Sequence, residues 1–72
     1  MKREEEIRKK LLEEDEEFRK LYEEHQLYER KIEELLSKGF LTPEEETEIK
    51  VMKKMKLLLK DKMQFIINKY KN

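Results

Sequence analysis

The sequence contains no cysteine and no tryptophan, and it has one glycine and one proline among 72 residues. The absence of cysteine excludes disulfides and thiolate metal sites, and nothing points to an oxidising compartment. Apolar runs stay far below the roughly 20 residues of a membrane span, and the N-terminus lacks the apolar core of a signal peptide. We therefore expect a cytoplasmic protein without a membrane span.

Candidate catalytic side chains are equally scarce. His25 is the single histidine, Ser37 is the single serine, and no glycine-rich phosphate loop is present. A chain this short buries only about 60% of the surface that its unfolded form exposes, so a deep cleft is not expected. The sequence predicts no enzymatic activity, no catalytic residue, no cofactor and no metal site.

Charged residues are abundant instead, with 18 Lys and Arg against 18 Asp and Glu and a net charge of zero. Residues 1–36 carry nine basic and thirteen acidic side chains, whereas residues 37–72 carry nine lysines and five acids. Apolar residues recur at helical spacing in both halves, which distinguishes the chain from a disordered one. The opposite charges favour pairing of the two halves with each other before any external partner.

Helix stop and start signals meet in the middle of the chain. Gly39 can adopt the left-handed conformation that closes a helix, and Phe40 is expected to fold back on Leu35. Thr42 is predicted to cap a second helix, with the single proline at the first helical position and Glu45 completing a capping box. Signals so close together predict that the chain turns back on itself here.

Two apolar stripes with the spacing of a coiled-coil seam flank this turn. The first contains Leu11, Phe18, Leu21, Tyr28, Ile32 and Leu35, and the second contains Ile49, Met52, Leu59, Met63, Ile66 and Tyr70. We predict an all-α fold, an antiparallel two-helix coiled-coil hairpin with helices over about 3–37 and 43–70, in a single domain over 1–72. Glu14 interrupts the first stripe and Asp15 could cap a fresh helix, which leaves room for a kink near 14–16. Residues 1–14 could then form a separate N-terminal helical turn.

Folding the chain at the turn aligns the stripes and sets polar residues side by side. The expected ion pairs are Lys31 with Glu48, Glu29 with Lys53, and Glu17 with Lys62. These pairs are exposed, so they select the register more than they stabilise it. On the seam, His25 faces Lys56, and we interpret this polar pair as a device that fixes register. The alternative is a pH-sensitive switch; a lone histidine makes a poor metal site.

Two surfaces of the second helix are candidates for binding. An apolar flank outside the seam is formed by Val51, Met55, Leu58 and Phe65. One partner helix cannot cover both flank and seam, which favours association of two hairpins or docking of a partner protein's helix. The alternative is an apolar flank covered by lysine stems. A basic face is formed by Lys50, Lys53, Lys54, Lys60 and Lys71. The zero net charge and the lack of arginine in this helix favour a solvated face over a nucleic-acid site.

From Glu14 onward, one set of residues has a recognisable spacing: Glu14-Asp15, Phe18, Leu21, Glu24-His25, Leu27, Ile32 and the run from Met52 to Asp61. In these residues the chain resembles the YdcH-like family of small bacterial proteins of unknown function. Relatives tend to carry a proline where Glu16 stands, which would break the first helix. The resemblance implies a helical hairpin without a known reaction, and no catalytic residue carries over.

These observations favour a small interaction protein that self-associates or docks on another protein through the apolar flank. The alternative function is binding of nucleic acid or an anionic surface through the basic face. The sequence names neither a partner nor an oligomeric state.

Overall fold

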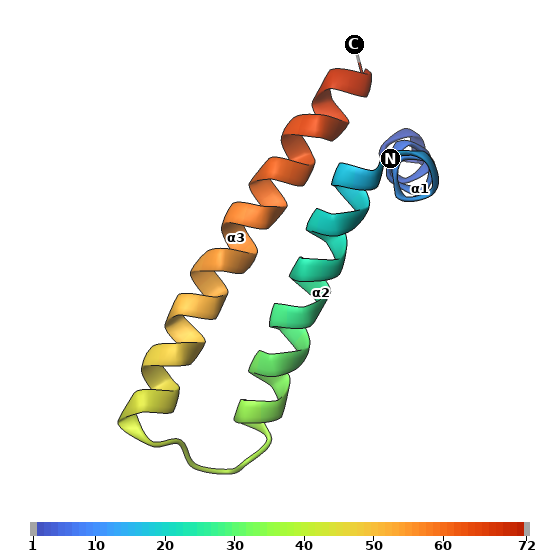
Figure 1. Cartoon of the computed structure of the whole chain (residues 1–72). Coiled ribbons are helices and arrows are strands. Elements are labelled where there is room, and N and C mark those ends of the chain that lie inside the picture. The colour runs from blue at the N-terminus through green and yellow to red at the C-terminus, as the bar shows by residue number, and fades with distance from the viewer. Residues whose placement is uncertain (1, 72) are drawn as a thin grey trace.

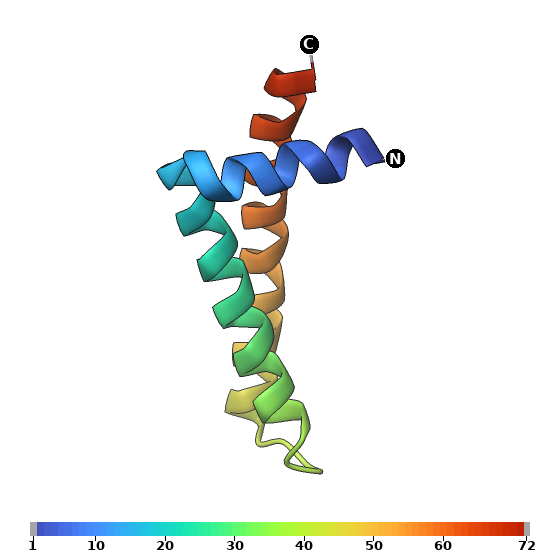
Figure 2. The same cartoon turned by 90° about the vertical axis from the view of Figure 1, so that its right-hand side faces the viewer.

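The computed structural model describes residues 2–71, and every regular element in that range is an α-helix. The helices are α1 (Lys2–Glu14), α2 (Glu16–Leu36) and α3 (Pro43–Lys71). α2 and α3 lie side by side in opposite directions (Figure 1), and α1 crosses them near the start of α2 and the end of α3 (Figure 2). The molecule is elongated, with extents of 45 × 23 × 16 Å. The predicted all-α class is confirmed.

The predicted helix over about 3–37 is two helices that meet at Asp15, within the 14–16 range where the sequence leaves room for a kink. This residue has an extended backbone (φ −109°, ψ 110°), and its Oδ1 accepts a hydrogen bond at 3.0 Å from the backbone N–H of Phe18. An aspartate in this position satisfies one of the free N–H groups at the start of a helix. α2 therefore begins at Glu16, and the break forms without the proline that the resemblance led us to expect there.

Arg19 secures the same junction from the other side. Its Nε donates a hydrogen bond to the Leu12 carbonyl at 2.9 Å, and its Nη2 donates one to the Glu13 carbonyl at 3.0 Å. The last carbonyls of a helix lack partners within it, so these bonds complete the end of α1. Because Arg19 belongs to α2, they also tie the direction of α1 to α2.

The largest buried cluster lies where the three helices meet. It consists of Leu11 from α1, Phe18 from α2, and Met63 and Ile67 from α3, and the Phe18 side chain is fully buried. The seam pattern favoured Ile66 and Tyr70 on α3, but Ile67 is 1% exposed and Tyr70 is 57% exposed. The crossing of α1 explains this difference, because Leu11 meets α3 on the side where Ile67 lies.

Toward the turn, the hairpin buries fewer side chains, and polar residues cap the ends of its helices. Ile32 and Ile49 are the buried residues in this half, while α2 ends at Leu36 with Ser37 as its C-cap. Gly39 has a φ of +91°, as its predicted role in the turn requires.

The predicted capping box at the start of α3 is confirmed. The Glu45 backbone N–H donates to Thr42 Oγ1 at 3.1 Å, and the Thr42 backbone N–H donates to Glu45 Oε1 at 3.0 Å. The predicted contact of Phe40 with Leu35 is wrong, because Phe40 is 82% exposed. The helix ends three residues before Gly39, so the glycine is not placed to fold Phe40 back on the last turn.

Candidate interaction surfaces

The four residues of the predicted apolar flank form an exposed stripe along α3, called here the apolar stripe. Val51, Met55, Leu58 and Phe65 are 56%, 36%, 48% and 62% exposed. The Lys69 ammonium lies 4.8 Å from the centroid of the Phe65 ring, so a lysine stem covers part of one end. Neither α1 nor α2 buries these side chains within the described chain.

Shallow hollows between α2 and α3 adjoin both ends of the apolar stripe. Near the turn, Val51 lines a hollow together with Tyr28 and Leu35 of α2. At the other end, Phe65 lines a second hollow with Leu21 of α2. The apolar residues of these hollows therefore adjoin the stripe, among charged side chains such as Lys31, Glu48 and Lys62.

The opposite side of α3 is basic. Lys53 and Lys60 follow Val51 and Leu58 by two positions, a step that turns an α-helix by about 200°. These lysines and Lys56 line a third hollow of about 750 Å³, whose α2 wall includes Tyr22, His25 and Glu29. Arg8 of α1 completes its lining. We call this the basic hollow.

None of the three predicted cross-helix ion pairs forms within the described residues. Glu29 pairs with Lys56 at 3.7 Å, one turn along α3 from its predicted partner Lys53. Within the described residues, neither Lys31 and Glu48 nor Glu17 and Lys62 approach to 4.0 Å, although each pair lines a common hollow. Long exposed side chains lose rotamer freedom when they pair, so such contacts form weakly.

His25 and Lys56 lie in the basic hollow, as the predicted seam pair requires them to be near each other. The ion pair of Lys56 is with Glu29, however, and the two predicted partners share no hydrogen bond within the described range. Both the register role and the pH-switch role of His25 stay predictions.

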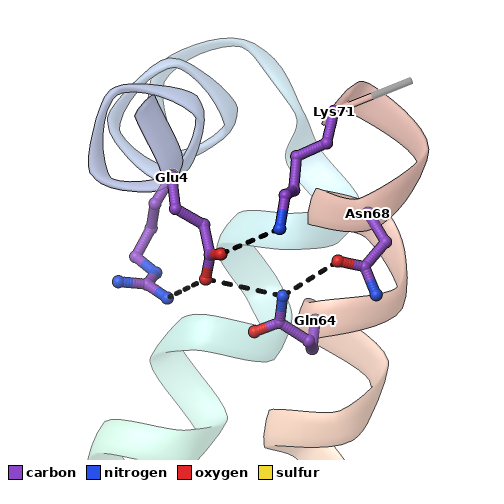
Figure 3. A network of polar contacts seen from close by, with 5 residues as sticks. Glu4, Gln64, Asn68 and Lys71 are labelled. Carbon is purple, nitrogen blue, oxygen red and sulfur yellow. Dashed lines mark hydrogen bonds and ion pairs between the residues drawn. The ribbon is translucent and has the colours of Figure 1, made fainter. Parts of the chain in front are cut away.

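A polar network joins α1 to the end of α3 (Figure 3). Lys71 Nζ donates to Glu4 Oε2 at 3.1 Å, and Gln64 Nε2 donates to Glu4 Oε1 at 3.5 Å and to Asn68 Oδ1 at 3.1 Å. The hydrogen bond and the charge of Lys71 lower the pKa of Glu4. Arg8 reaches the same carboxylate only at 4.0 Å. The network thus helps to hold α1, and with it Arg8, against α3.

The predicted basic face divides into groups with different surroundings. Lys53 and Lys60 line the basic hollow, Lys71 is bonded to Glu4, and Lys50 and Lys54 are exposed outside the hollow. Sequence reasoning missed Arg8, which comes from the other end of the chain. Its only signal was the separation of residues 1–14 from the first seam, which could have indicated a helix that crosses the hairpin.

Taken together, the fold and its surfaces define a small helical hairpin with a crossing N-terminal helix and two contrasting exposed sides. The chain belongs to the family described as protein of unknown function (DUF465), whose family model matches residues 18–67, more than half of its length. The YdcH-like resemblance is consistent with this membership. Comparison with curated proteins and with solved structures gave no match. No helix in residues 2–71 is both long enough and apolar enough to cross a membrane.

Proposed function

We propose that this protein is a non-enzymatic, cytoplasmic interaction module that associates with a second copy of itself through the apolar stripe. The observation that carries the proposal is the exposure of Val51, Met55, Leu58 and Phe65 on one side of α3. A row of large apolar side chains at helical spacing is the usual anchor set for a second helix. Contiguous apolar surface on a small protein marks an interaction site more often than scattered residues do.

A second copy fits the stripe when the two α3 helices run antiparallel across a two-fold axis at Leu58. Val51 and Phe65 both lie seven positions from Leu58, so each Phe65 would meet Val51 of the other copy. In the first turn of α3, Glu44 would lie opposite the last turn of the other copy, which contains Lys69. A two-fold interface repeats every favourable pair twice, which supports a symmetric dimer.

The expected affinity is modest. Two copies would bury eight side chains that are already about half covered, which contributes about 6–12 kcal/mol. Association costs about 4–15 kcal/mol in lost freedom of motion. We therefore expect a dimer that forms in the micromolar range or above and dissociates on dilution.

Sedimentation equilibrium from about 1 μM to about 1 mM tests this proposal. We expect the wild-type mass to rise toward that of a dimer and Leu58→Asp to stay monomeric. Leu27→Asp is the matched control, because Leu27 lies on α2 and is 47% exposed against 48% for Leu58. A wild-type monomer at every concentration, or equal dissociation by both substitutions, would contradict the proposal.

Binding of nucleic acid or an anionic surface through the basic face is the second candidate. We rank it lower because Lys71 already pairs with Glu4, and because Lys50 and Lys54 lie outside the hollow that Lys53 and Lys60 line. Such binding would weaken steeply with added salt and would be unaffected by Leu58→Asp. A gel-shift assay at low salt with both variants separates it from dimerisation.

A further inference from the structure

We propose that the basic hollow is a binding site for a small compound that carries two or three phosphoryl groups. Four cations line it, Arg8 from α1 and Lys53, Lys56 and Lys60 from α3, against the single carboxylate of Glu29. Lines of like charge in a concave surface concentrate the field and attract an oppositely charged ligand. The hollow lies on the side of α3 opposite the apolar stripe, so the inference is independent of dimerisation.

Few carboxylates neutralise the positive charges of the hollow. Within the described residues, Lys53 and Lys60 have no carboxylate inside 4.0 Å, and Lys56 has Glu29 at 3.7 Å. Arg8 is 4.0 Å from Glu4, whose carboxylate Lys71 holds at 3.1 Å. The guanidinium of Arg8 therefore keeps donors for a planar, forked contact with a phosphoryl group.

The spacing of the lysines indicates more than one anionic group. With a rise of about 1.5 Å per residue, Lys53, Lys56 and Lys60 are spread over about 10 Å of the α3 axis. A single phosphate cannot contact all three and Arg8 together. A chain of two or three phosphoryl groups can lie along the row, with its far end at Arg8.

The shape of the site favours a small ligand over a nucleic-acid strand. The volume of about 750 Å³ falls in the range of about 300–1,000 Å³ typical of small-molecule sites. Tyr22 is the aromatic residue in its lining, whereas single-strand binders stack successive bases on several aromatic side chains. α1 also crosses the hairpin at this end (Figure 2), and its Arg8 lines the hollow.

The test is calorimetric titration of the whole chain with inorganic tripolyphosphate at about 20 mM salt and again at about 200 mM. We expect saturable one-to-one binding that Lys53→Gln/Lys60→Gln weakens by about tenfold or more. Lys50→Gln/Lys54→Gln is the matched control, since it removes two lysines of the same helix from outside the hollow, and we expect less than about a twofold change. Equal weakening by both double variants, or no binding at low salt, would overturn the proposal.

The contribution of Arg8 tests whether the hollow is a specific site or whether the lysines of α3 alone attract the anion. We expect Arg8→Gln to weaken tripolyphosphate binding by several fold, and Arg3→Gln, an exposed change on the same helix, to leave it unchanged. Amide shifts of the wild type on titration should cluster around Arg8, Tyr22 and Lys56, a readout that needs no variant. Shifts spread evenly over α3, or a ten-nucleotide single strand that binds far more tightly than tripolyphosphate, would also overturn the proposal.

Discussion

At the end of the hairpin where α1 crosses, side chains from three helices form one buried cluster, whereas the turn end relies on Ile32, Ile49 and polar caps. A pair of helices alone can cover only one stripe on each member. The added α1 places Leu11 over Phe18 and Ile67 and gives this small chain a local third layer. The comparison indicates that packing stabilises one end and that backbone geometry and capping define the other.

The largest effect is expected from truncation in the three-helix cluster. Phe18→Ala should destabilise the fold by about 3–5 kcal/mol, because the fully buried ring leaves a cavity that three helices cannot easily close. This is comparable to the whole stability that a core of this size supplies. Urea unfolding measures the loss, with the exposed Leu27→Ala as a control that should change stability by about 0.5 kcal/mol or less.

The same experiment on Ile49→Ala sharpens the contrast between the ends. We expect a loss near the lower limit of about 2–5 kcal/mol, since the thinner turn end can collapse more readily. A larger loss for Ile49→Ala than for Phe18→Ala would reverse the assignment of the main core.

Removal of the Asp15 cap at the helix break should have the next largest effect on stability. Asp15→Ala removes the acceptor for the Phe18 N–H and should cost about 1 kcal/mol. Asp15→Asn keeps a capping oxygen and should cost much less. Hydrogen exchange adds a spatial readout, because loss of the cap should speed exchange at Phe18 and in the first turn of α2 more than near Thr42. Uniform acceleration over all three helices would show that the break is not a separate element of stability.

Gly39 tests the turn end. Its φ of +91° strains any residue with a Cβ atom, although open space surrounds the position where that atom would lie. Gly39→Ala should therefore destabilise by about 1 kcal/mol through backbone strain alone. Thermal unfolding checks this value, and Ser37→Ala offers a comparison in the same turn without the positive φ. A neutral Gly39→Ala would mean that the turn relaxes to another conformation.

The smallest effect is the pH dependence of one exposed carboxylate at each end. Hydrogen bonds from Lys71 and Lys38 lower the pKa of Glu4 and Glu45 from the ordinary value of 4.5. Both groups then bind protons less readily in the folded state, so their stabilisation is present above pH 4.5 and is lost as pH falls through their folded pKa values. Melting temperatures between neutral pH and pH 3 should fall less steeply for Glu4→Gln and Glu45→Gln than for the wild type, and added salt should shrink the difference.

The turn end was predictable because its signals are local. Thr42 and Glu45 are three residues apart, and a capping box needs nothing beyond that spacing. Gly39 was assigned correctly to a positive φ, but the contact of Phe40 was not, since it depends on where α2 stops. The predicted end of this helix was one residue too late, and a shift of one residue is enough to point the Phe40 side chain away from Leu35.

The three-helix end was less predictable because its contacts join distant segments. Periodicity placed Leu11 and Phe18 on one stripe, yet it could not show that a break at Asp15 would turn α1 across α3. That crossing buries Ile67 and leaves Tyr70 exposed, and it also brings Arg8 to the lysines of α3. The apolar stripe was visible in the sequence, whereas the basic hollow required the tertiary arrangement.

The two hydrogen bonds from Arg19 to the carbonyls of Leu12 and Glu13 lie at the helix break, but they also affect the position of residues farther along α1. Together with the packing of Leu11 and the Glu4–Lys71 contact, these bonds help to fix the direction of α1 and so help to place Arg8 near the lysines of α3. A lysine at position 19 would keep the charge but not the planar pair of donors, so it would fix the angle between α1 and α2 less firmly. An arginine in the first turn of α2 thus influences the position of an arginine on the preceding helix.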